Sequence, residues 1–164
     1  MEMNYAEVLN YAYDHLKDDS GLGIAIRELD PEKEAYNFNW LLWQGFDHGT
    51  DISEFEQEAE ISAQKSPHLN PKLSLAVVNE KGEDVAYSCL WFSEKTDYAY
   101  IEPVCTVPAY RGKGIGKAVL FEALNRAMDM GAKVAYVISE QEFYRKLGLQ
   151  KDMVFTFYWK DERE

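Results

Sequence analysis

Residues 107–119, VPAYRGKGIGKAV, place three glycines, one arginine and two lysines between a predicted strand and a predicted helix. Glycines let several backbone N–H groups turn toward one bound anion, and the dipole of the following helix adds attraction for negative charge. The loop therefore predicts a binding site for a phosphate-bearing ligand.

The spacing within this loop excludes the two commonest nucleotide-binding patterns. A P-loop needs a glycine five residues before its Gly-Lys pair and a serine or threonine after it. Arg111 and Ala118 hold those two positions. A dinucleotide loop needs glycines in the pattern G-x-G-x-x-G. Neither Gly112 nor Gly114 has a glycine five residues later.

Composition limits the classes of ligand further. The chain has 164 residues, of which 46% are hydrophobic, so we expect one folded domain with a sizeable core. Seventeen Lys and Arg against 29 Asp and Glu give a net charge of −12. This charge argues against nucleic acid as a partner and is compatible with a cationic small molecule. No signal-like amino terminus and no run of 18 apolar residues occurs, so we expect no membrane partner and a cytoplasmic location.

The two cysteines, Cys89 and Cys105, lie in strand-like segments without metal-ligand spacing. We therefore expect buried free thiols in a reducing compartment and no metal site. The alternative, Cys105 as a nucleophile, is disfavoured because no histidine and no helix start adjoins it.

The elements that position the loop are read from periodicity and from start and stop signals. In the first part of the chain, the sequence predicts helices over residues 4–17, 31–45 and 53–66 and one short strand over residues 24–29. Strands follow over 72–79, 84–92 and 98–107, with Pro103 marking a break or bulge in the last of them. After the loop come a helix from Ile115 to Gly131, a strand over 132–138, a helix over 140–148 and a strand over 153–159.

This order predicts an α/β protein with a mixed sheet, in which strand 98–107 pairs in parallel with strand 132–138. The residues Arg111-x-x-Gly114-x-Gly116, between that strand and its helix, resemble the pyrophosphate loop of the GNAT N-acetyltransferase superfamily, Q/R-x-x-G-x-G/A. The segments TVPAY and FYRKLGL are similar to the same family and occur in the expected order. The resemblance covers residues 73–150 well, with strand 24–28 and two helices in addition.

The resemblance implies the GNAT acyl-CoA N-acyltransferase fold over residues 21–164, with antiparallel N-terminal strands and a splayed parallel pair at the coenzyme site. Residues 1–20 would then be a helical extension. This extension is either a dimerisation element, which would make the protein a homodimer, or the end of a preceding domain in a longer chain.

The implied co-substrate is acetyl-CoA. Main-chain groups of four strand residues would pair with its pantetheine arm, namely Val104, Cys105, Thr106 and Val107. Loop amides would hold its pyrophosphate while Arg111 shapes the loop; these are the amides of Gly112, Lys113, Gly114, Ile115, Gly116 and Lys117. Ser139 stands where many relatives carry an asparagine that contacts the coenzyme, so its role is open.

The resemblance also implies catalytic roles. Tyr144 matches the family tyrosine near the coenzyme sulfur and would protonate the departing thiolate. Glu102 is the candidate base, with a water chain as the alternative. A backbone N–H freed near residues 104–106 would stabilise the oxyanion.

The acceptor site is expected near the first two helices that follow strand 24–29. Trp40, Trp43, Phe46, Asp47 and His48 combine aromatic faces with a carboxylate, which suits an ammonium or guanidinium group. Tryptophans at helical spacing also suit a core, and a histidine at a helix end also suits a cap.

The function that follows is acetyl transfer to a small primary amine by direct attack in a ternary complex. Two alternatives stay open. One is acetylation of a peptide or protein amine, and the other is a coenzyme A-binding sensor or assembly module without turnover.

Overall fold

The computed structural model describes residues 24–58, 69–154 and 156–158. The predicted helix over residues 4–17, and with it the extension over residues 1–20, lies outside these residues. Among the described helices, none has the length and apolarity that a membrane-spanning helix requires.

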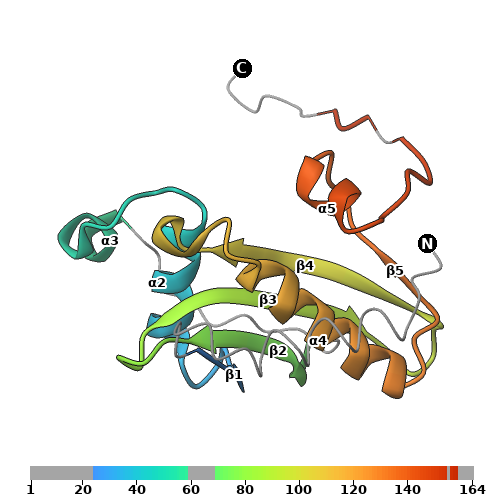
Figure 1. Cartoon of the computed structure of the whole chain (residues 1–164), viewed down its shortest axis with the longest axis horizontal. Coiled ribbons are helices and arrows are strands. Elements are labelled where there is room, and N and C mark those ends of the chain that lie inside the picture. Colours follow the sequence, from blue (N-terminus) through green and yellow to red (C-terminus); the bar gives the residue numbers. More distant parts are fainter. Residues whose placement is uncertain (1–23, 59–68, 155, 159–164) are drawn as a thin grey trace.

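Within the described residues, five strands form one sheet in the order of the chain (Figure 1). They are β1 (Ala25–Glu28), β2 (Leu69–Val78), β3 (Asp84–Phe92), β4 (Tyr98–Thr106) and β5 (Val134–Tyr136). The pairs β1–β2, β2–β3 and β3–β4 are antiparallel, and β5 runs parallel to β4. The predicted mixed sheet, with antiparallel N-terminal strands and one parallel pair, is confirmed.

Helices lie on both faces of this sheet. They are α2 (Ala35–Gly45), α3 (Ile52–Glu58), α4 (Ile115–Asp129) and α5 (Glu142–Lys146), with a short 3-10 turn, η1 (Pro108–Tyr110), after β4. The helix predicted from residue 31 begins at Ala35, because the Asp30 carboxylate first accepts the N–H groups of Glu32 and Lys33 and closes a turn.

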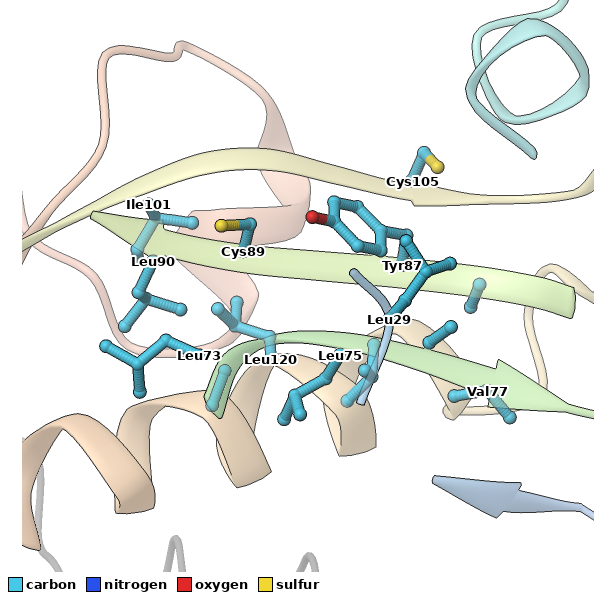
Figure 2. Close-up of a cluster of buried hydrophobic side chains, with 14 of the residues drawn as sticks. Leu29, Leu73, Leu75, Val77, Tyr87, Cys89, Leu90, Ile101, Cys105 and Leu120 are labelled. Atoms are coloured by element: carbon cyan, nitrogen blue, oxygen red, sulfur yellow. The ribbon is translucent and has the colours of Figure 1, made fainter. Parts of the chain in front are cut away.

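The core lies between the sheet and α4. The predicted apolar stripe of α4 is buried, from Ile115 through Leu120 to Ala127. Figure 2 shows Leu73, Leu75 and Leu120 gathered there. On the opposite face, α2 covers part of the sheet, where Phe38 packs edge-on against Tyr87 at 5.3 Å between ring centroids.

The regular pairing of β4 with β3 is interrupted next to Pro103, where the sequence predicts a break or bulge. Between the pairs Ser88–Val104 and Leu90–Ile101, two β4 residues, Glu102 and Pro103, lie opposite Cys89 alone. This is a β-bulge, and the peptide bond between Glu102 and Pro103 is cis.

The parallel pair is splayed. Only residues 98–100 of β4 pair with β5, so β5 is shorter than the predicted strand 132–138. From residue 101 to 106 the outer edge of β4 has no strand neighbour within the described part of the chain. An extended ligand therefore has access to backbone groups at this edge.

The predicted strand over residues 153–159 is wrong for the residues described there, none of which belongs to a strand. Alternating apolar side chains form a strand only where a sheet edge is available, and this segment leaves the body of the molecule beyond α5 (Figure 1). Its side chains Met153, Val154, Phe157 and Tyr158 are exposed.

Candidate active site

A cavity of about 570 Å³ lies where β4 ends, between the loop that follows it, the end of α2 and the helix α5. Twelve predicted site residues line it: Phe46, Asp47, Val104, Cys105, Thr106, Arg111, Gly112, Gly114, Ile115, Gly116, Lys117 and Tyr144. The predicted coenzyme loop and the predicted acid thus share one cavity.

The loop enters α4 through two glycines in the left-handed region. Gly112 has a φ of 73° and Gly114, which is the residue before α4, has a φ of 79°. Among the described residues no side chain caps this end of α4, and its first turn carries no acidic residue. The N–H groups of a first helical turn have no acceptor within the helix, so this uncapped turn at the cavity suits an anion.

Gly116 allows the same turn to approach β4 closely. A Cβ atom built on Gly116 would lie 2.8 Å from Thr106 Oγ1, closer than such atoms approach each other. Glycine at this position therefore sets the distance between the first turn of α4 and the end of β4, which together form one wall of the cavity.

Arg111 holds the loop in place from three sides. Its Nε donates to Thr106 O at 2.9 Å and its Nη2 donates to Gly45 O at 2.9 Å. Its Nη1 donates to Asp47 Oδ2 at 3.0 Å, within an ion pair. The guanidinium thus joins β4, the loop and the end of α2.

The other predicted coenzyme residues lie around this loop. The Val107 N–H donates to Val85 O and the Val107 carbonyl accepts from Tyr110 N, so this structure does not support main-chain pairing of Val107 with a ligand. Lys113 Nζ lies 5.0 Å from the ring centroid of Tyr110. Ser139 Oγ accepts the N–H of Gln141 just before α5.

Tyr144 and Glu102 are close enough to influence each other. Burial raises the pKa of the Tyr144 hydroxyl to about 12, with further contributions from the Glu102 charge and from Tyr100. The Tyr100 hydroxyl donates to Glu102 Oε2 at 3.4 Å, and Trp91 Nε1 donates to Glu102 O at 2.9 Å. The Glu102 carboxylate thus lies near enough to the Tyr144 phenol to raise its pKa, while Tyr144 is the one of the two that lines the cavity.

Both cysteines are buried free thiols, as predicted. Burial raises the pKa of Cys89 and of Cys105 to about 12. Because the thiolate is the nucleophilic form, the Cys105 nucleophile considered from the sequence is not supported. Cys105 instead packs against α2, where a Cβ on Gly45 would collide with its sulfur.

The aromatic residues predicted for the acceptor divide into two groups. Trp40 and Trp43 pack against the fully buried Phe55 of α3, at 5.1 and 5.8 Å between ring centroids. His48 stacks on Trp43 at 4.9 Å and is absent from the cavity lining. Phe46 lines the cavity and is 46% exposed. The structure thus brings one of these four residues to the predicted coenzyme loop.

Sequence reasoning missed several residues of the site. Gln141 and Phe143 line the cavity beside Tyr144, and their position directly before the FYRKLGL tyrosine was an available signal. Tyr100 lies two residues before Glu102 on one strand, so strand alternation alone puts both on one face. Trp91 needed the register of β3 against β4, which no local pattern contains.

This arrangement of a splayed parallel pair, a glycine loop and an uncapped helix start coincides with a family match. Residues 32–149, well over half of the chain, match the model of the Acetyltransferase (GNAT) family. The chain belongs to the GNAT acetyltransferase family. Its mixed sheet is the sheet of that family, as the solved structures below also show.

A relative and two solved structures illustrate this membership. An uncharacterised N-acetyltransferase of Methanocaldococcus jannaschii is 35% identical over 78 residues, which are 43% of this chain and 34% of the relative. The chain thus aligns with about a third of that relative's length.

An aminoglycoside acetyltransferase from an uncultured soil metagenomic sample is 19% identical, with a TM-score of 0.62, over 84% of this chain and 99% of that one. Glucosamine-6-phosphate N-acetyltransferase of Arabidopsis thaliana is 20% identical, with a TM-score of 0.58, over the same shares. At these identities the two structures show the fold.

Proposed function

We propose that this GNAT protein transfers an acetyl group from acetyl-CoA to a primary amine of a small cationic molecule, by direct attack in a ternary complex. The observation that carries the proposal is the uncapped start of α4, which opens through Gly112 and Gly114 into a cavity that Tyr144 also lines. One cavity thus holds an anion-binding loop together with an acid.

The residues present fit the coenzyme. Loop amides from 112 to 117 and the first turn of α4 would hold the pyrophosphate, with Arg111 fixing the loop behind them. The unpaired edge of β4, from residue 104 to 106, would pair with the pantetheine arm as an added strand. When bound, acetyl-CoA supplies an acetyl thioester at the end of the cavity near Tyr144.

Two proton transfers complete the reaction. Glu102 would accept the proton of the attacking amine, directly or through a water. Tyr144, whose pKa of about 12 keeps it protonated at neutral pH, would donate a proton to the sulfur of the departing thiol. A backbone N–H at the unpaired edge of β4 would stabilise the negative charge on the carbonyl oxygen.

A cationic amine is favoured by charge. The chain carries a net charge of −12, and the negative charge of Glu102 is near enough to the proposed acid to raise its pKa. Structural neighbours named for aminoglycosides and for glucosamine 6-phosphate support a small-molecule amine. Acetylation of a peptide or protein amine, and coenzyme binding without turnover, are the outcomes that a screen must distinguish.

Release of the coenzyme thiol from acetyl-CoA in the presence of an amine panel tests the proposal. The panel should pair small diamines and amino sugars with a lysine-containing peptide and a protein substrate. We expect thiol release with small cationic amines. Thiol release with only the peptide or the protein substrate would support acetylation of a peptide or protein amine. Coenzyme binding without thiol release across the panel would support coenzyme binding without turnover.

The three-sided attachment of Arg111 leads to a separate prediction. We expect Arg111→Ala to weaken acetyl-CoA binding about 10-fold, since hydrogen bonds from a charged group contribute about 1.5–3 kcal/mol each. Asp47→Ala should weaken it by roughly 3-fold or less, because an exposed ion pair contributes about 0–1 kcal/mol and the bonds to Gly45 O and Thr106 O remain. Calorimetric titration compares the two variants, and equal losses would show that the ion pair, not the carbonyl bonds, positions the loop.

A further inference from the structure

We propose that the cationic end of the acceptor amine binds on an open aromatic surface of β3, β4 and β5, a surface distinct from the α2 aromatics. This aromatic wall consists of Trp91, Tyr98, Tyr100 and Tyr136, with the Glu102 carboxylate at its edge. The inference rests on the proposed function and names the part of the site that recognises the acceptor.

The strand registers put the four rings on one face. Trp91 is the direct partner of Tyr100 across the antiparallel pair, and Tyr100 is the partner of Tyr136 across the parallel pair. Directly paired residues point to the same side of a sheet. The rings of Tyr98 and Tyr136 meet at 5.9 Å in an edge-on arrangement. The four rings therefore lie on one face across three strands.

The opposite side of the same strand segment is core. Ala99 and Ile101 alternate with the tyrosines and are each 1% exposed. Tyr98 and Tyr136, in contrast, are 46% and 41% exposed. Tyr87 lies farther along β3 on the same face as Trp91 and is fully buried, because Phe38 of α2 packs against it. Helix α2 thus covers one half of this face and leaves the wall accessible.

Glu102 joins the wall to the proposed chemistry. Its carboxylate accepts from the Tyr100 hydroxyl at 3.4 Å, and its carbonyl accepts from Trp91 Nε1 at 2.9 Å, which fixes that indole beside the carboxylate. Glu102 and Tyr100 both contribute to the raised pKa of Tyr144, and Tyr144 lines the cavity. Tyr144 therefore lies between the wall and the cavity of the glycine loop.

Aromatic faces and a carboxylate together select a cation. An ammonium group is attracted to the faces of Trp and Tyr rings, and a neighbouring carboxylate adds charge complementarity. A diamine or polyamine would place one ammonium on the wall while its second, neutral amine faces Glu102. The α2 aromatics are less suited to this, since Trp40 and Trp43 are already packed against Phe55.

A pair of probes with the same shape tests the wall without a known substrate. Choline carries a quaternary ammonium, and 3,3-dimethyl-1-butanol is its neutral counterpart. NMR titrations of the full chain, saturated with coenzyme A, should show choline binding more tightly than the alcohol. Trp91→Leu and Tyr136→Leu should each weaken choline binding about 3- to 30-fold and leave the alcohol unchanged.

Two matched controls accompany these variants. Tyr158→Leu removes a tyrosine that is 91% exposed and lies on the segment beyond α5, and it should leave choline binding unchanged. Phe46→Leu removes the exposed aromatic at the end of α2. Equal affinity for choline and for the alcohol would contradict the proposed wall. Weaker choline binding in Phe46→Leu, with unchanged choline binding in Trp91→Leu and Tyr136→Leu, would also contradict it.

Acetyl-CoA titration of the same samples separates this inference from the function on which it rests. Unchanged acetyl-CoA affinity in both wall variants, with weaker choline binding, supports both proposals. Choline binding that depends on the wall in a protein without acetyl-CoA binding would leave the wall standing and remove the proposed function. Tyr136→Leu keeps the test decisive if Trp91→Leu does not fold, because Tyr136 lies at the exposed edge.

Discussion

Gly114→Trp is expected to weaken acetyl-CoA binding more than about 100-fold. Gly114 has a φ of 79° directly before α4 and lines the cavity. A residue with a side chain is strained in this conformation, and an indole here would occupy the space in front of the first helical turn. Both effects remove the proposed anion site, and calorimetric titration measures the loss.

Gly82→Trp is the matched control for this substitution. Gly82 has a φ of 80° in the turn between β2 and β3, and a Cβ built there meets nothing within 4 Å. The control therefore carries the same backbone strain away from the cavity. We expect both variants to lose similar thermal stability while Gly82→Trp keeps its acetyl-CoA affinity. Retained affinity in Gly114→Trp would show that the coenzyme binds elsewhere.

Tyr144→Phe is expected to lower kcat about 10²- to 10³-fold on the amine found in the screen, with acetyl-CoA affinity changed less than about 3-fold. The substitution removes the proton that the thiol needs and keeps the ring that lines the cavity. Tyr158→Phe removes a hydroxyl from a tyrosine that is 91% exposed and should leave kcat unchanged. A Tyr144→Phe variant as fast as the parent would exclude Tyr144 as the acid.

The same residue determines the alkaline side of the pH profile. The hydroxyl of Tyr144 has its pKa raised from 10.0 to about 12, so it stays protonated and able to donate until the pH approaches that value. Activity that depends on this proton is therefore present at lower pH and is lost only as the pH rises through the raised value. We therefore expect kcat to show no decline centred near pH 10.0. A decline near pH 10.0 in the parent protein that is absent from Tyr144→Phe would contradict the burial of the Tyr144 hydroxyl.

Local features of the chain were predictable from the sequence. The glycine loop, the apolar stripe of α4 and the break at Pro103 each depend on residues close in sequence, whose backbone preferences act wherever the chain folds. These features also contain the proposed coenzyme half of the site, because a strand, a loop and a helix start that follow one another are neighbours in space.

The remaining features depend on contacts between distant residues. Arg111 is bound to Gly45 O and to Asp47, more than 60 residues away along the chain. The pairing of Trp91 with Tyr100 depends on register, and no local pattern specifies it. The sequence left the tryptophans of α2 open between the acceptor site and the core, because periodicity does not show that Phe55 packs against them.

The segment over residues 153–158 illustrates the same limit. Its alternating apolar side chains have strand propensity, yet strand formation requires a partner edge at the right place. In the described structure β5 is three residues long, and the chain passes through α5 before reaching this segment. Propensity alone therefore predicted a strand that the described residues of this segment do not form.

Direct transfer from acetyl-CoA to a cationic amine is tested most directly by quantifying both products in one reaction. Purified protein, acetyl-CoA and the best amine of the screen are mixed, and released thiol and acetylated amine are measured over time, with the intact mass of the protein recorded in parallel. We predict equal amounts of thiol and acetylated amine, and no acetylated protein when the amine is omitted. Acetylated protein formed before the amine is added, or bound acetyl-CoA that releases no thiol with any amine, would contradict the account.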